Sequence, residues 1–188
     1  MQRIFLFSLL ACLSMLASAE PETYIIDGAH TYPSFSYNHL GFSNQTHRFT
    51  KTSGTITLDR IVGAGSAEVV VDAKSVDTGN ELFNRVIQNE DFLDTAHYPA
   101  ITYKSARMRF AGDRLVAVEG ELTIKGVTRP VELEVTSLHC KSHPLRQRNT
   151  CGANATARIK RSEFNMGKYV PYVGDEMTLS ISVEAINE

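Results

Sequence analysis

Six histidines are the side chains of this 188-residue sequence best suited to metal binding or proton transfer. No pair of them lies in a helical segment at the ligand spacing of a zinc site, and none lies near a Cys-x-x-Cys pair. The sequence therefore predicts no metal site. The six residues are His30, His39, His47, His97, His139 and His143.

His39 stands apart from the other histidines because it alternates with two aromatic residues. Phe35, Tyr37 and His39 share one face of an extended segment, whereas His30 and His47 fall in segments that we expect to be loops. A histidine on an apolar face is either a core residue hydrogen-bonded to backbone or a contact for a bound ligand. The pattern is compatible with both interpretations.

Arg161 is the second polar residue on an apolar face, because it follows Ala157 and Ile159 at every second position. A buried guanidinium is costly unless it is paired or hydrogen-bonded. Arg161 could pair at a barrel rim with an aspartate such as Asp175, which would be a structural role. It could instead meet an anionic head group, since its planar fork suits phosphate.

Motifs of nucleophilic and phosphate-binding enzymes are missing from the sequence. There is no Gly-x-Ser-x-Gly elbow and no glycine-rich phosphate loop, and the carboxylates fall mostly on outward strand positions. The sequence therefore predicts no catalytic residue and no cofactor. A formal net charge of −2 argues against a nucleic-acid partner.

The first 19 residues have the pattern of a cleavable secretory signal peptide. Arg3 supplies a positive start, an apolar run of 13 residues follows over 4–16, and Ala17-Ser18-Ala19 offers a cleavage site after Ala19. Lipid attachment at Cys12 is the weaker alternative. The run is too short to cross a bilayer, so we expect an exported chain without stable membrane insertion.

Two cysteines, Cys140 and Cys151, remain after such cleavage. Export places them in an oxidising compartment, where a disulfide is the default. A redox pair is the alternative, although its usual Cys-x-x-Cys spacing is absent.

Alternation of apolar and polar residues recurs along the rest of the chain, which is typical of strands with one buried face. One segment, which begins at Thr78, has a helical pattern instead. There Thr78 and Glu81 have the spacing of a capping box, and apolar residues follow at helical positions. The inward strand positions include Ile56, Leu58, Val116, Val118, Leu122, Ile124, Val131, Leu133, Val135, Met177, Leu179, Ile181 and Val183.

These patterns predict an all-β fold of eight to nine antiparallel strands, with one short helix inserted between the fourth and fifth strands. We expect a single domain over 20–188. Closing the sheet into a barrel would remove its edges, and about eight strands can enclose a small ligand. A two-sheet sandwich is the alternative, because alternation alone does not separate the two.

The mature sequence resembles the YceI-like family of bacterial secreted proteins, over 23–186. The resemblance is carried by an ordered set of short blocks along the chain, and the stretch 120–131 is the most specific. The blocks are Tyr24-Ile25-Ile26-Asp27, Phe35-Ser36-Tyr37-Asn38-His39-Leu40-Gly41, Tyr98-Pro99-Ala100-Ile101-Thr102-Tyr103, Gly120-Glu121-Leu122-Thr123-Ile124-Lys125-Gly126, Arg161-Ser162-Glu163-Phe164-Asn165-Met166 and Val173-Gly174-Asp175-Glu176.

This resemblance implies a lipocalin-like barrel in the periplasm that holds a polyisoprenoid or similar long-chain lipid, for transport or storage. The alternatives are an enzyme acting on an isoprenoid or quinone-like lipid and a ligand-free, stress-related interaction module. A homodimer is compatible with the sequence. The alternation along the strands and the apolar face of the helical segment predict which side chains contact the lipid. The expected contacts are Phe35, Tyr37, Phe83, Phe92, Ile101, Tyr103, Leu122, Phe164 and Met166, with a polar end at Asn38, His39 and Arg161.

Overall fold

A computed structural model describes residues 20–188 of the chain, so the expected signal peptide and the alternative lipid site at Cys12 lie outside the described residues. The described residues form eleven strands, one α-helix and two short 3-10 turns. The strands are β1 (Glu22–Ile26), β2 (Tyr32–His39), β3 (Ser43–Phe49), β4 (Thr52–Asp59), β5 (Ala64–Asp72), β6 (Val76–Asp77), β7 (Ala100–Ala111), β8 (Arg114–Ile124), β9 (Val127–Ser142), β10 (Asn149–Lys160) and β11 (Val173–Asn187). The helix is α1 (Glu81–Gln88), and the turns are η1 (Ala73–Ser75) and η2 (Arg161–Phe164).

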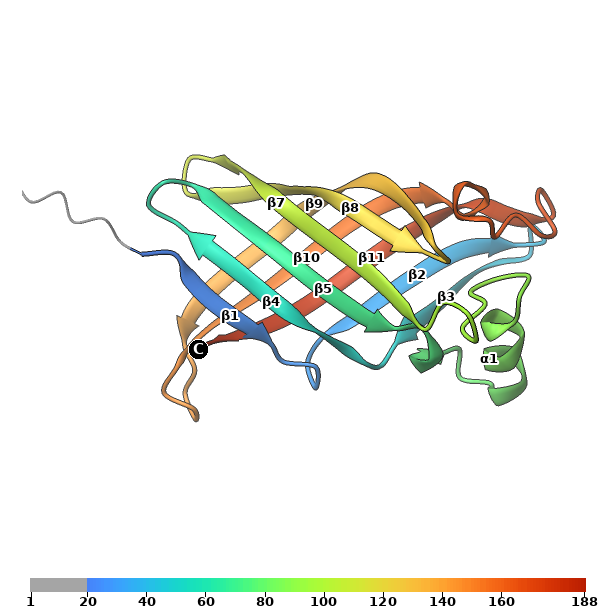
Figure 1. The fold of residues 1–188 in the computed structure, drawn as a ribbon, viewed down its shortest axis with the longest axis horizontal. Coiled ribbons are helices and arrows are strands. Elements are labelled where there is room, and N and C mark those ends of the chain that lie inside the picture. The colour runs from blue at the N-terminus through green and yellow to red at the C-terminus, as the bar shows by residue number, and fades with distance from the viewer. Residues whose placement is uncertain (1–19) are drawn as a thin grey trace, which may run out of the picture.

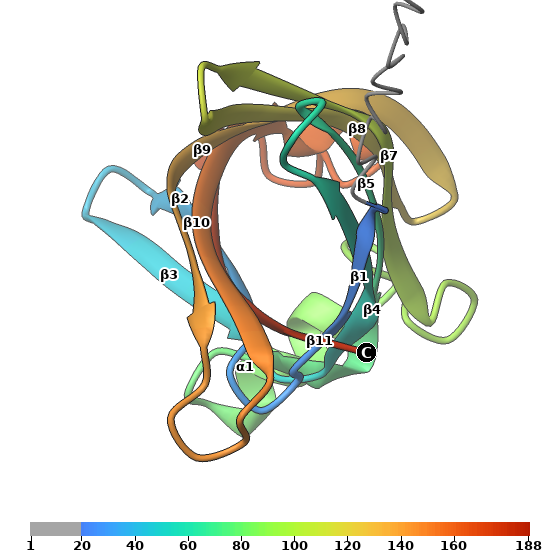
Figure 2. The ribbon, with the colours of Figure 1, turned by 90° about the vertical axis from the view of Figure 1, so that its left-hand side faces the viewer.

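Eight of the strands close into a barrel, in the order β1-β4-β5-β7-β8-β9-β10-β11. The last strand returns to the first, with Tyr24 opposite Asn187 and Ile26 opposite Ala185. All the pairings are antiparallel, and Figure 2 shows the resulting ring of strands end on. The closed barrel is therefore confirmed over the sandwich.

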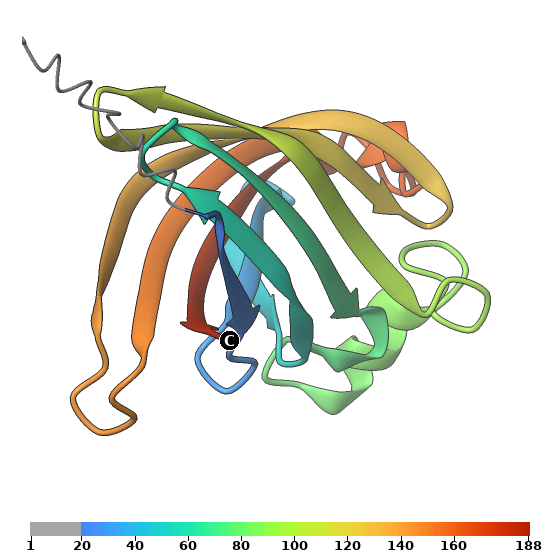
Figure 3. The same ribbon diagram turned by 60° about the vertical axis from the view of Figure 1, so that its left-hand side comes forward.

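β11 changes partner along its length, and this opens the barrel at one end. Its residues 173–182 pair with β2 rather than β1, and β2 continues the sheet through β3 to the short β6. The α1 helix, the β2–β3 turn and the segment 161–172 gather at this end, which we call the mouth end (Figures 1 and 3). The turns β4–β5, β7–β8 and β9–β10 lie at the opposite, far end. Because short strands raise the strand count, the helix follows the sixth strand rather than the fourth.

The α1 helix begins two residues later than the capping-box spacing predicts. Its N-cap is Asn80, whose side-chain oxygen accepts a hydrogen bond from the Phe83 amide at 3.0 Å. The Thr78 hydroxyl instead lies 2.7 Å from the side-chain oxygen of Asn84. The expected cap at Thr78 was therefore wrong, because an asparagine two residues later is at least as good a cap.

The alternation of apolar and polar residues predicts which strand positions face inward, except where a strand contains a bulge. On β8, Val118, Leu122 and Ile124 are buried as expected. Between β7 and β8 the register skips Val116, so that Leu115 is buried in its place. The expected inward position of Val116 was wrong, since an extra residue on one strand reverses the parity beyond it.

A disulfide joins Cys140 on β9 to Cys151 on β10, as expected. The two residues are directly opposite in the ladder, and the Cys151 side chain is buried inside the barrel. The bond therefore fastens the far ends of two adjacent strands that a turn already connects.

Candidate binding cavity

The barrel interior contains a row of three apolar chambers. The mouth chamber measures about 200 Å³, the middle chamber about 120 Å³ and the far chamber about 110 Å³. Neighbouring chambers share walls: Phe35, Phe49 and Leu179 line both the mouth and the middle chambers. Val69 and Tyr103 line both the middle and the far chambers. The three chambers therefore follow one another along the barrel axis.

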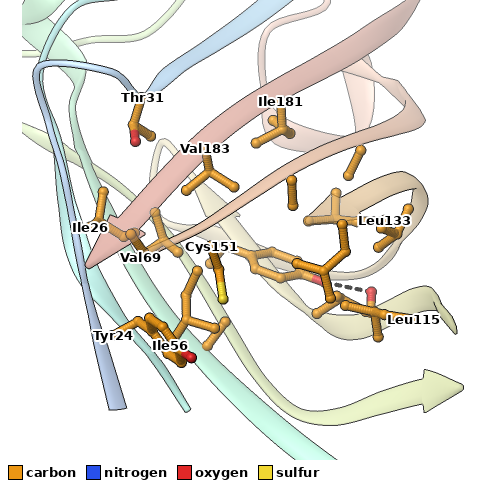
Figure 4. Close-up of a pocket in the computed structure, with 18 of the residues that line it drawn as sticks. Tyr24, Ile26, Thr31, Ile56, Val69, Leu115, Leu133, Cys151, Ile181 and Val183 are labelled. Atoms are coloured by element: carbon orange, nitrogen blue, oxygen red, sulfur yellow. Dashed lines mark hydrogen bonds between the residues drawn. The ribbon is translucent and has the colours of Figure 1, made fainter. Parts of the chain in front are cut away.

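The far chamber is lined almost entirely by carbon. Figure 4 shows its side chains converging from strands on opposite sides of the barrel. Its polar atoms include the Thr31 hydroxyl, which donates to the Glu184 carbonyl at 3.2 Å. The Thr52 hydroxyl is buried and has no hydrogen-bond partner within the described chain. The labelled lining residues in Figure 4 are Tyr24, Ile26, Thr31, Ile56, Val69, Leu115, Leu133, Cys151, Ile181 and Val183.

Tyr103 lines both the far chamber and the middle chamber. Its hydroxyl lies 2.8 Å from the Val118 carbonyl oxygen and 3.0 Å from that of Val131, so the ring is held against the barrel wall over Gly120 of β8. Burial raises the pKa of the Tyr103 hydroxyl above its ordinary value. Gly120 makes this position possible, because a Cβ there would lie 2.7 Å from the ring carbon that carries the hydroxyl.

The mouth chamber is built from barrel strands, from β2 and from the helix. Phe83, Val86 and Ile87 of α1 form one wall of it. Two ties hold the loops around its opening: Lys168 pairs with Asp91, and the Lys125 ammonium group donates to the backbone carbonyl of Asn165 at 3.0 Å and to that of Glu90. The opening is therefore framed by segments 89–98 and 161–172 together with α1.

His47 forms a buried pair with Tyr37 beside the mouth chamber, with 3.2 Å between its Nε2 and the tyrosine hydroxyl. Its ring packs between Phe35 and Phe83, at centroid distances of 5.5 and 5.4 Å. Only 4% of His47 is exposed, and its Nδ1 has no hydrogen-bond partner among residues 20–188. Burial lowers the pKa of the His47 imidazole and raises that of the Tyr37 hydroxyl.

The expectation that His47 lies in a loop was wrong. It belongs to β3, and a signal for this was present because His47 and Phe49 alternate with polar neighbours. The polar run Asn44-Gln45-Thr46 concealed the strand. His39, by contrast, lies at the end of β2, half-buried, and contributes to the mouth chamber.

Arg161 is 4% exposed, and backbone carbonyls surround its guanidinium group. It donates to Gly174 and Lys168 at 2.9 Å, to Val173 at 2.8 Å, and to Met166. Burial lowers the pKa of the guanidinium. Arg161 therefore holds the 166–174 segment against the end of β10.

The expected rim pair between Arg161 and Asp175 is replaced by two separate interactions. Asp175 accepts hydrogen bonds from the Ser162 amide at 2.9 Å and from the Ser162 hydroxyl at 2.8 Å. The carboxylate thus organises the η2 turn, while the carbonyls of the following segment satisfy the guanidinium.

Ten of the twelve residues expected to contact a lipid line one or more of the chambers. Phe164 is fully buried but packs in the core outside them. Asn38 is exposed on the outer face of β2, where its side-chain oxygen accepts from the Gly41 amide. The ten lining residues are Phe35, Tyr37, His39, Phe83, Phe92, Ile101, Tyr103, Leu122, Arg161 and Met166.

The arrangement of side chains and helices over residues 20–188 bears on two other kinds of site, a metal site and a membrane span. No group of three or more histidine, cysteine, aspartate or glutamate side chains in this range is arranged to hold a metal ion. No helix in this range is long and apolar enough to cross a membrane.

A closed antiparallel barrel with a carbon-lined interior and one helix beside its mouth defines a small β-barrel protein of lipocalin-like architecture. The profile of the YceI-like domain matches residues 24–185. Protein YceI of Escherichia coli O157:H7 is 33% identical over 174 residues, covering 91% of this chain and 90% of the relative. Protein YceI of Salmonella arizonae is 31% identical over 185 residues, covering 97% and 96%. The chain belongs to the YceI-like family.

Solved structures share the fold. BcnA of Burkholderia cenocepacia has a TM-score of 0.72 and 28% identity, covering 85% of this chain and 98% of its own. A protein from Saccharophagus degradans, described as a polyisoprenoid binding domain implicated in plant cell wall breakdown, has a TM-score of 0.67 and 20% identity. It covers 88% of this chain and 98% of its own.

Proposed function

We propose that the protein binds the apolar tail of a polyisoprenoid or a similar long-chain amphiphile inside the barrel, and carries or stores it in the periplasm. The observation that supports this most is the row of three apolar chambers that begins at the mouth end. An isoprenoid tail has almost no hydrogen-bonding capacity, so a carbon-lined interior can bury it without leaving a polar group unpaired. The description of the Saccharophagus relative as a polyisoprenoid binding domain supports the same ligand class.

The chamber volumes suggest how much tail fits without rearrangement. A dry cavity of about 150 Å³ holds a six-carbon ring such as benzene. On that scale each chamber takes roughly one five-carbon isoprene unit, so the three chambers take about three units. A longer tail would require the segments at the mouth to move, or would leave part of the tail outside.

The mouth chamber favours a ligand with an uncharged head group. Among residues 20–188, Arg161 is the only lysine or arginine that lines it, and this guanidinium already donates to four backbone carbonyls. The other polar side chains at this chamber, including those of His39, Tyr37 and Tyr169, offer hydrogen-bonding groups. An alcohol or carbonyl head would find partners there, whereas a phosphate would lack a free cation.

Titration of delipidated protein with farnesol and with farnesyl phosphate tests this function. Both probes carry three isoprene units, and we expect farnesol to bind one to one and more tightly than the phosphate. Leu122→Arg should abolish binding, because Leu122 lines the middle chamber. Glu121→Arg is the matched control, since Glu121 is the next residue on β8 and faces outward.

A second variant keeps the test valid if Leu122→Arg does not fold. Ala155 lines the far chamber, so Ala155→Leu adds bulk only there. We expect this change to weaken farnesol and to leave geraniol, which has two isoprene units, almost unaffected. Equal farnesol binding by wild type, Leu122→Arg and Ala155→Leu would contradict the proposed function.

A further inference from the structure

An exposed apolar surface surrounds the opening of the mouth chamber. It includes the β2–β3 turn, where Phe42 is 87% exposed, and the 169–172 segment, where Tyr172 is 75% exposed. The Leu40 amide donates to the Tyr172 carbonyl at 3.1 Å, so these two segments are joined. We call this surface the mouth patch; its residues are Leu40, Phe42, Leu82, Val86, Tyr169, Val170 and Tyr172.

The mouth patch is continuous with the interior of the barrel. Val86 of α1 and Tyr169 belong to both, because each is exposed and each also lines the mouth chamber. Tyr169 further contacts the ring of Phe92, another lining residue, at a centroid distance of 6.4 Å. The patch and the chamber therefore form one continuous apolar surface, along which an apolar molecule can enter the barrel.

The shape and charge of the patch suit a lipid bilayer. It is made of a hairpin turn, a loop and one helix face at one end of the barrel, which can enter a bilayer surface together (Figures 1 and 3). Tyrosine and phenylalanine side chains favour the interfacial region of membranes. Two of the cations beside the patch pair with carboxylates, Lys168 with Asp91 and Arg85 with Glu81.

We propose that the mouth patch docks on the surface of a lipid bilayer, and that the ligand passes between bilayer and barrel without crossing water. This inference rests on the proposed function for its cargo, but the docking itself does not require cargo. Because Arg85 and Lys168 are paired with carboxylates, we expect apolar insertion to drive the contact. Docking is therefore expected on zwitterionic lipid and should change little with salt.

Flotation with vesicles of phosphatidylcholine and phosphatidylethanolamine, without added isoprenoid, tests the docking surface. The double variant Phe42→Ser and Tyr172→Ser should lower the bound fraction at least tenfold, since each residue loses the burial of a large apolar side chain. The matched control is Leu145→Ser with Ile61→Ser, which removes equally exposed side chains from the far end. We expect this control to float like the wild type, at low and at high salt.

Farnesol titration separates this proposal from the proposed function. Phe42 and Tyr172 do not line the chambers, so their double variant should bind farnesol as the wild type does. Failure of farnesol binding by the wild type would overturn the cargo and leave the docking result intact. Absence of wild-type flotation, or an equal loss in the far-end control, would overturn the docking surface.

Discussion

Replacing Arg161 distinguishes a structural clamp from a head-group receptor. In Arg161→Met the side chain keeps an unbranched apolar stem and loses every donor, so the carbonyls of Met166, Lys168, Val173 and Gly174 lose their shared partner. Hydrogen bonds from a charged donor contribute about 1.5–3 kcal/mol each, and the cost of burying the guanidinium offsets part of that gain. We therefore expect the free energy of unfolding to fall by about 3–5 kcal/mol.

Urea unfolding followed by circular dichroism measures this change directly. Arg158→Met is the matched control, because Arg158 lies on β10 three residues before Arg161, is exposed, and approaches Glu176 only at 3.7 Å. Its loss should cost less than about 1 kcal/mol. Arg161→Lys should fall between the two, since an ammonium group keeps the charge but does not reach four carbonyls from one position.

A head-group receptor would behave in the opposite way. It would leave the stability of Arg161→Met within about 1 kcal/mol of the wild type, a change typical of surface positions, and lower the affinity for farnesyl phosphate selectively. That combination would refute the assignment of Arg161 as a clamp.

Three further substitutions, at His47, Gly120 and Asn80, test other contacts of the structure. Because burial lowers the pKa of His47, the unfolded chain takes up a proton at higher pH than the folded chain, and the free energy of unfolding should fall from pH 7 towards pH 5. In His47→Gln that loss should be smaller when unfolding is measured at each pH, and an identical slope would contradict the assignment. Gly120→Ala should cost about 1–3 kcal/mol in urea unfolding, since its Cβ would collide with the Tyr103 ring; a neutral change would mean that the ring relocates freely. Asn80→Ala should cost about 1 kcal/mol and speed amide exchange at Phe83, whereas unchanged exchange would argue against the observed cap.

Strand parity predicted most of the cavity lining because a barrel has one interior, and every inward side chain must face it. Leu122, Ile101 and Tyr103 therefore lie where alternation placed them. Parity failed at Val116 because a bulge is a local change of register, and neither alternation nor turn residues mark it.

The partners of the polar residues could not be predicted from the sequence. Alternation gave the correct face for Arg161, but its acceptors are backbone carbonyls of a loop, and every residue has such a carbonyl. His47 was missed because its neighbours on β3 are polar, so that a solvent-facing strand and a loop have similar composition. The pairing of His47 with Tyr37 depends on the β2–β3 register, which only the closed structure fixes.

The central claim, that the barrel holds an isoprenoid tail with a neutral head, is tested most directly by native mass spectrometry of protein purified from the cells that produce it. The result we expect is a one-to-one complex whose extracted ligand carries isoprene units and no phosphate. A ligand-free protein at its unmodified mass, obtained without detergent or organic solvent, would contradict the claim. A phosphate-headed ligand would contradict the neutral head group and return Arg161 to the role of an anion contact.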